Sequence, residues 1–314
     1  MPTTRTPRPG ARRTAPRRPA AVRRARRLLA TLAAGTVVLA AGVVWLTQDE
    51  DAPAVRERCS ARVGGESTSM SPEQAGNAAT VVGISVLRGL PARAATIAVA
   101  TIVQESRMEN LDHGDRDSLG LFQQRPSQGW GTPAQVQDPV YATNAFYDAL
   151  VEVDGYRDLP VTDAAQEVQR SGFPLAYGDH EPEARLVAST LTGYDPGGFS
   201  CHLRALGDSI ERGDDDSPTP TAGRLREAAA AQVTTTAPAV VADTEGKVLE
   251  YRLEGEEAAR LAWAVAGWSV ASAKTYDVTE VSVAGSRWTR ERSGRGWVAA
   301  DTGVPTGGVR VRVA

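Results

Sequence analysis

Glu105 is the residue of this 314-residue chain whose surroundings best suit acid catalysis. It follows an almost wholly apolar stretch, Ala94 to Val103, whose composition predicts a buried helix. The helix dipole and desolvation both disfavour a charged carboxylate at the carboxyl end of such a helix. Both effects raise its pKa, as a general acid working near neutral pH requires. The alternative is an exposed glutamate on the last helical turn, held by Arg107.

A second motif follows Glu105 at a fixed distance. Ser106 comes directly after it, and a Gly-Leu-Phe-Gln sequence that ends at Gln123 begins fifteen residues after it. This order resembles the signature of the soluble lytic transglycosylases, which belong to the lysozyme-like superfamily near goose-type lysozyme. The resemblance covers about residues 70–200, and the wider stretch 110–131 is similar to lysozyme-like modules of actinobacterial envelope proteins.

The resemblance implies cleavage of peptidoglycan glycan strands between MurNAc and GlcNAc, by a lytic transglycosylase or a muramidase. Glu105 would donate its proton to the bridging oxygen, and no cofactor or metal ion is implied. Either water or the sugar's own 6-hydroxyl would capture the oxocarbenium-like centre, and the second route gives a 1,6-anhydro product. That route needs no carboxylate nucleophile, so one glutamate can serve as acid and then as base.

A hydrolytic variant needs a second carboxylate to position water. Asp115 and Asp117 are the candidates, and Asp112 is a third. The alternative for these aspartates is turn chemistry in a glycine-containing loop. A calcium loop is a further alternative, although their spacing is not that of an EF-hand.

Four further residues are candidates for holding the glycan. From the resemblance we expect Ser106 and Gln123 near the substrate, with Gln123 on the floor of the cleft. Trp130 lies in a Gly-Trp-Gly sequence and either stacks on a sugar face or covers the core. The Ala-Tyr-Asn motif of the family has no evident counterpart, so Tyr177 or Tyr194 would have to supply its hydroxyl.

Cys59 and Cys201 are the only cysteines, and they bracket a region with the character of one domain. Outside the cytoplasm two thiols are expected to pair. A bridge closing a loop of this length contributes about 5 kcal/mol in the chain-entropy model. The alternative is two separate buried thiols.

The amino terminus has the pattern of a membrane anchor. Residues 1–27 form an Arg-rich tail, and residues 28–46 are uncharged. A helix of that length spans roughly 28 Å, about the thickness of a bilayer core. The flanking arginines predict a single-pass protein of the cell membrane, with its amino end in the cytoplasm and its bulk outside. A cleaved signal peptide is the alternative.

The charge distribution argues against nucleic acid as a partner. Ten arginines and no acidic residue lie in residues 1–48, so residues 49–314 carry 25 basic and 38 acidic residues, a net charge of −13. Nucleic-acid binding requires a basic face, which an acidic ectodomain is poorly suited to provide.

The pattern along the chain predicts a mainly α lysozyme-like domain over 59–212 and a linker over 213–243. Residues 244–314 predict a small α+β module, in which one helix packs on an antiparallel sheet. Four of the six tryptophans lie in this module. They are expected in its core, or else Trp288 or Trp297 lies on a surface that binds glycan or an envelope partner protein.

Two function classes remain open from the sequence. The first is a membrane-anchored cell-envelope protein that cleaves peptidoglycan. The second is a non-catalytic peptidoglycan-binding or scaffold protein of an envelope complex. A tyrosine hydroxyl next to Glu105 in the folded chain would favour the enzyme.

Overall fold

Three strands pair within the region that the sequence predicts to be mainly α. A computed structural model describes residues 56–207, 221–240 and 246–314. β1 (Arg58–Val63), β2 (Glu66–Met70) and β3 (Phe199–His202) form an antiparallel sheet in the order β2-β1-β3. These strands are short, and β3 pairs with β1 across 142 residues, so no local alternation in the sequence revealed them.

The second sheet has six strands in the order β4-β5-β9-β6-β7-β8, and its neighbouring strands pair antiparallel. Its strands are β4 (Ala239–Val240), β5 (Val248–Arg252), β6 (Val278–Val283), β7 (Ser286–Thr289), β8 (Val298–Ala299) and β9 (Gly308–Val313). The predicted fold class is therefore wrong: the described residues form a mixed α and β fold with eight α-helices and two antiparallel sheets.

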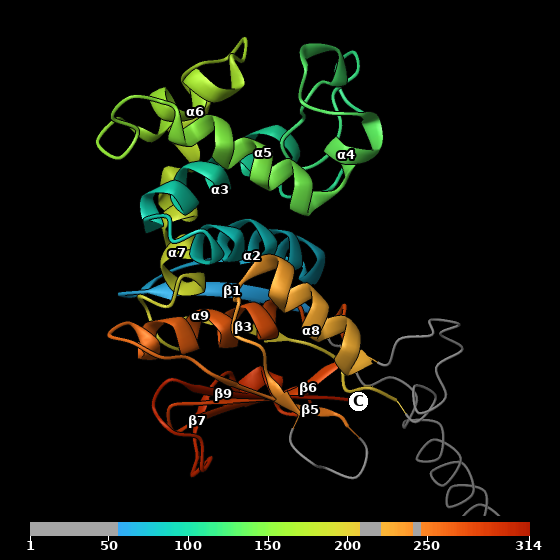
Figure 1. Ribbon diagram of the computed structural model, residues 1–314, viewed down its shortest axis with the longest axis vertical. Helices are drawn as coiled ribbons and strands as arrows, with labels where there is room; N and C mark the ends of the chain where they lie inside the picture. Colours follow the sequence, from blue (N-terminus) through green and yellow to red (C-terminus); the bar gives the residue numbers. More distant parts are fainter. Residues whose placement is uncertain (1–55, 208–220, 241–245) are drawn as a thin grey trace, which may run out of the picture. The chain divides into compact units, whose positions relative to one another are not determined.

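Eight α-helices accompany the two sheets in the described residues. They are α2 (Pro72–Leu87), α3 (Ala92–Ser106), α4 (Pro133–Gln137), α5 (Pro139–Val151), α6 (Val161–Gln169), α7 (Glu181–Leu191), α8 (Thr221–Gln232) and α9 (Ala258–Ala271). α9 packs on the six-stranded sheet through β6 and β9. α2 packs against the face of α9 that is turned away from this sheet (Figure 1). α2 begins as its sequence predicts, because Ser71 and Gln74 form a capping box.

The predicted tail over 1–27 and the predicted membrane helix over 28–46 lie outside the described residues. Among the residues that are described, no helix is long and apolar enough to cross a membrane.

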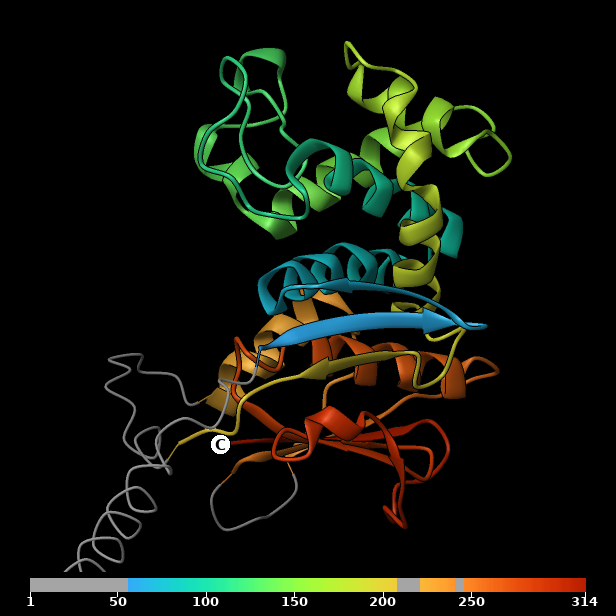
Figure 2. The same ribbon diagram turned by 180° about the vertical axis from the view of Figure 1, so that it is seen from behind.

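The disulfide predicted between Cys59 and Cys201 is confirmed. The two residues are directly opposite each other in the β1–β3 pair, and both are buried. Figure 2 shows the two strands running side by side.

Two tryptophans join the carboxy-terminal sheet to the three-stranded sheet. Trp288 is fully buried and donates its Nε1 hydrogen to the carbonyl oxygen of Cys201, at 3.1 Å. Trp297 is half-buried, and its Nε1 lies 2.7 Å from the carbonyl oxygen of Phe199. Trp288 therefore contributes to the core, which leaves Trp297 as the more accessible of the two.

Candidate active site

α3 places Glu105 on its last turn, with most of the preceding helix buried. The helix ends because Arg107 takes the left-handed conformation, with φ at 55°. Side-chain amides from α2 hold this turn: Gln74 donates to the carbonyl of Arg107, and Asn77 to that of Met108, each at 2.8 Å. The Glu105 side chain is itself half-buried. It thus stands on a fixed backbone at the edge of the core.

Tyr177 supplies a hydroxyl directly to Glu105. It lies in the short 3-10 helix η3 (Ala176–His180), its side chain is buried, and its hydroxyl donates to Glu105 Oε1 at 2.5 Å. Tyr194 is more than half exposed and packs over the guanidinium of Arg260, 4.9 Å from the ring centre. Of the two tyrosines considered from the sequence, Tyr177 is the one that contacts Glu105.

Gln169 is a second neighbour of Glu105, and no sequence pattern indicated it. It ends α6, lies close enough to the Glu105 carboxylate to lower its pKa, and donates from Nε2 to the carbonyl of Phe122 at 2.8 Å. It therefore links the glutamate to the Gly-Leu-Phe-Gln turn.

Burial raises the pKa of Glu105, while the hydrogen bond from Tyr177 and the nearby amide of Gln169 oppose that rise without cancelling it. The pKa of the Tyr177 hydroxyl is also raised, first by burial and then by the charge of Glu105. Tyr177 therefore remains a donor, and Glu105 holds a proton to higher pH than an exposed glutamate would.

The Gly-Leu-Phe-Gln turn has a structural reason for each residue. Leu121 and Phe122 are buried, and Phe122 stacks on Phe146 with ring centres 4.6 Å apart. Gly120 has a φ of +76°, and a Cβ there would lie 2.2 Å from the carbonyl oxygen of Val136. Only glycine fits that position, because both the backbone conformation and the close approach exclude a side chain.

Ser106 and Gln123 hold this turn in place rather than standing free. The Ser106 hydroxyl is buried and donates to the carbonyl of Leu121 at 2.7 Å. Gln123 is half-buried, and its Nε2 donates to the carbonyl of Gly120 at 3.1 Å. Both residues predicted to bind substrate thus have backbone partners, and Ser106 is almost fully buried.

The three aspartates considered as second carboxylates lie in the loop between α3 and the Gly-Leu-Phe-Gln turn. Asp117 accepts from the backbone N–H of Ser127 at 2.7 Å and from Arg125 Nε at 2.8 Å, which holds its pKa well below the usual range. Asp115 is almost fully exposed, and Asp112 is exposed beside His113. No hydrogen bond of the described residues joins any of them to Glu105. Nor do the described residues contain a group of three or more side chains able to hold a metal ion.

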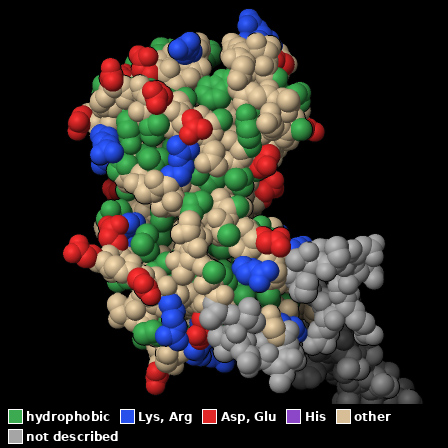
Figure 3. Space-filling view, viewed as in Figure 1, with side chains coloured by type: hydrophobic (Ala, Val, Ile, Leu, Met, Phe, Trp, Pro, Cys, Tyr) green, Lys and Arg blue, Asp and Glu red, His purple; other side chains and the backbone are tan. Residues whose placement is uncertain are grey.

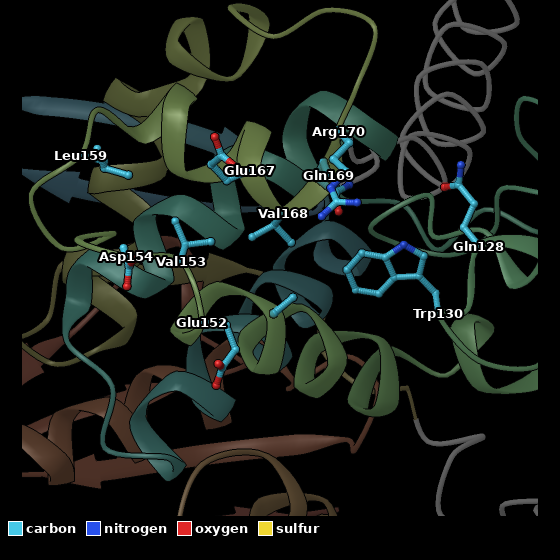
Figure 4. A pocket seen from close by; sticks show the side chains of 11 residues that line it. Gln128, Trp130, Glu152, Val153, Asp154, Leu159, Glu167, Val168, Gln169 and Arg170 are labelled. Atoms are coloured by element: carbon cyan, nitrogen blue, oxygen red, sulfur yellow. The ribbon is translucent and has the colours of Figure 1, made fainter.

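A cleft of about 920 Å³ opens next to Gln169. It lies between the end of α5, the end of α6 and the loop that carries Trp130. In Figure 4, Trp130 and Arg170 lie at one end of the cleft, and Asp154 and Leu159 lie at the other. The half-buried Trp130 ring also packs against the core, so it both covers apolar residues and forms a wall. Gln169 lines the cleft and thus connects it to Glu105, which is not itself part of the lining.

Sequence reasoning also missed the contact that η3 makes through His180. Its Nε2 lies 2.9 Å from Gln104 Oε1 and its Nδ1 lies 3.0 Å from Glu183 Oε1. Neither His180 nor Gln169 carries a local signal, since each meets α3 only because α6 and η3 fold back on it. A helix-terminal glutamine is too common to have been singled out.

Comparison with models of known protein families finds no matching family, and comparison with curated proteins finds no match.

Proposed function

We propose that this protein cleaves peptidoglycan glycan strands with Glu105 as the general acid. The observation that carries the proposal is the buried Tyr177 hydroxyl, 2.5 Å from a half-buried carboxyl group of raised pKa. Raised carboxyl pKa values occur at catalytic acids more often than at structural glutamates. A disulfide supports an oxidising compartment, where this polymer is found.

The hydrogen bond from Tyr177 decides which oxygen carries the proton. Because Tyr177 donates to Oε1, the acidic proton of Glu105 belongs on Oε2. That proton passes to the bridging oxygen as the glycosidic bond breaks. The carboxylate left behind is stabilised by the hydrogen bond from Tyr177 and by the nearby amide of Gln169.

The same carboxylate then acts as the base. It takes the proton of the sugar's 6-hydroxyl while that oxygen bonds to the anomeric carbon, which yields a 1,6-anhydro end. We favour this route over hydrolysis because the Asp117 carboxylate is already held by Ser127 and Arg125 and Asp115 is almost fully exposed, so neither is prepared to activate water. A water-activating carboxylate would have to lie on the opposite face of the sugar, several ångströms from the acid.

The cleft suits a glycan in size and lining. Its volume of about 920 Å³ is near the upper end for ligand pockets, and the Trp130 ring offers a flat apolar wall. One observation favours the binding-only alternative: Glu105 does not line the cleft, so a glycan could be held there without reaching the acid.

The test is mass spectrometry of muropeptides after purified full-length protein is incubated with sacculi. We expect 1,6-anhydro products from the wild type and none from Glu105→Gln. The matched control is Glu109→Gln, which changes an exposed glutamate four residues away. If the wild type and Glu105→Gln bind sacculi equally and neither releases fragments, the protein is a binding module.

A further inference from the structure

A second pocket, of about 290 Å³, lies between the outer face of the β1–β3 pair and the loop around η5 (Ser293–Arg295). Strand alternation determines which side chains face it. Cys59 and Ala61 point into the core, so Arg58, Ser60 and Arg62 point outward. On β3 the outward residues are Ser200 and His202, directly opposite Ser60 and Arg58.

The loop comes close to the strands because it contains glycine. A Cβ on Gly294 would lie 3.3 Å from Nε2 of His202, and one on Gly296 would lie 3.5 Å from the Ser200 hydroxyl oxygen. Between these glycines, Arg295 adds a third guanidinium to the pocket lining.

Both ends of the loop are fastened to β3 and the residue after it. The Ser293 hydroxyl lies 3.0 Å from the backbone nitrogen of Leu203 and 2.9 Å from its carbonyl oxygen. Trp297 bonds the carbonyl of Phe199 and packs edge-on against Trp263, with ring centres 5.1 Å apart. The disulfide joins the two strands underneath. The walls of the pocket are therefore set before any ligand arrives.

The charge of this pocket is uncompensated. No aspartate or glutamate lines it, and within the described part of the chain the guanidinium groups of Arg58, Arg62 and Arg295 have neither an ion pair nor a hydrogen bond. By contrast, Lys274 and Arg204, which lie close to the same strands in sequence or space, both pair with Glu57. On the face shown in Figure 3, acidic and basic side chains are interspersed.

We propose that this pocket binds a phosphate group. Guanidinium groups match the oxygens of a phosphate in pairs, and three of them with two serine hydroxyls suit a doubly charged oxyanion better than a single carboxylate. The volume accommodates a phosphate with a small substituent. The proposal does not depend on Glu105 or on glycan cleavage.

The test is isothermal titration calorimetry of the full-length protein with inorganic phosphate at constant ionic strength. We expect saturable binding that weakens at least tenfold in the Arg62→Gln, Arg295→Gln double variant. Both arginines are exposed and unpartnered, so this variant should unfold at the wild-type temperature. The matched control, Arg157→Gln with Arg252→Gln, removes the same charge from exposed positions outside the pocket and should bind as the wild type does.

An equal loss in both double variants, or no saturable binding in the wild type, would overturn the proposal. Phosphatidylglycerol vesicles then identify the source of the phosphate, with phosphatidylcholine vesicles as the reference. Vesicle binding that inorganic phosphate displaces, and that Arg62→Gln, Arg295→Gln lacks, assigns the pocket to a lipid headgroup. Saturable phosphate binding without vesicle binding assigns it to a soluble phosphate compound.

Discussion

Glu105 and the arginines of the β1–β3 face meet opposite surroundings. The Glu105 carboxyl group is half-buried, accepts a hydrogen bond from Tyr177 and lies near the Gln169 amide, and both partners are more than sixty residues away in sequence. Arg58 and Arg62 stand on an exposed strand face without a partner among the described residues. The buried surroundings of Glu105 therefore favour a change in its protonation state. The unpaired guanidinium groups of Arg58 and Arg62 are instead available to bind an anion.

Removing the disulfide should affect the arginine-lined pocket much more than the site around Glu105. Cys59 and Cys201 join the strands that form the basic pocket, whereas the Glu105 group rests on helices. Replacing both cysteines with alanine should lower the free energy of unfolding by about 2–5 kcal/mol, because the open chain gains entropy when unfolded. Urea denaturation measures this loss.

Phosphate titration of the same variant, below its unfolding midpoint, sharpens the comparison. Phosphate affinity should fall, since the strands are no longer held in register by the bridge. Glycan cleavage should persist at low temperature. A loss of cleavage with phosphate affinity intact would show that the disulfide supports the Glu105 site rather than the arginine-lined pocket.

Gly193 is the point where the turn after α7 meets α9, and it connects the helical region to the carboxy-terminal sheet. Its φ is +83°, and a Cβ would lie 2.1 Å from the carbonyl oxygen of Arg260. Gly193→Ala should cost about 2–4 kcal/mol, combining backbone strain with a clash. Gly155→Ala is the control: it has φ at +69° with open space around it, so it should show the strain alone, about 1 kcal/mol. Thermal unfolding of both variants would refute the clash if the two losses were equal.

Tyr177→Phe tests whether the hydrogen bond from Tyr177 to Glu105 contributes to catalysis. The bond lowers the pKa of Glu105, so its removal should raise that pKa further and extend the active form to higher pH. Cleavage should fall about tenfold, because the carboxylate formed after proton transfer loses a donor. The pH dependence of cleavage gives both quantities.

Tyr194→Phe is the matched control, since that ring is exposed over Arg260 and away from Glu105. It should leave the pH profile unchanged. A structural role for Tyr177 alone would lower activity without moving the profile.

The sequence located what is local and missed what depends on distant pairing. The capping box at Ser71 and the buried helix that carries Glu105 on its last turn follow from neighbours within a few residues, and the structure has both. The disulfide followed from there being only two cysteines. The strands around it did not, because β1 alternates over six residues only and its partner lies at the far end of the region.

The candidate site divides in the same way. Glu105 and Tyr177 could be nominated by residue type, but the choice of Tyr177 over Tyr194 required the fold. Asp115 and Asp117 matched a catalytic type, yet Asp117 is engaged in a turn with Ser127 and Arg125. Gln169 was missed because its role comes from position alone.

The smallest expected effect is the change in the free energy of unfolding caused by Glu105→Gln. Its pKa is raised in the folded state, so its protonated form favours folding. That contribution is fully present below the unfolded pKa and is lost as pH rises through the higher folded pKa. Glu105→Gln is neutral at every pH and can still accept the Tyr177 hydrogen bond. It should therefore match the wild type near pH 3 and exceed it near pH 7 by about 1 kcal/mol or less. Urea denaturation at the two pH values, with Glu109→Gln as the exposed control, measures the difference. A variant less stable than the wild type at pH 7 would mean that the glutamate is held as a structural anion, and Glu105 would then resemble the paired carboxylates of this protein rather than a proton donor.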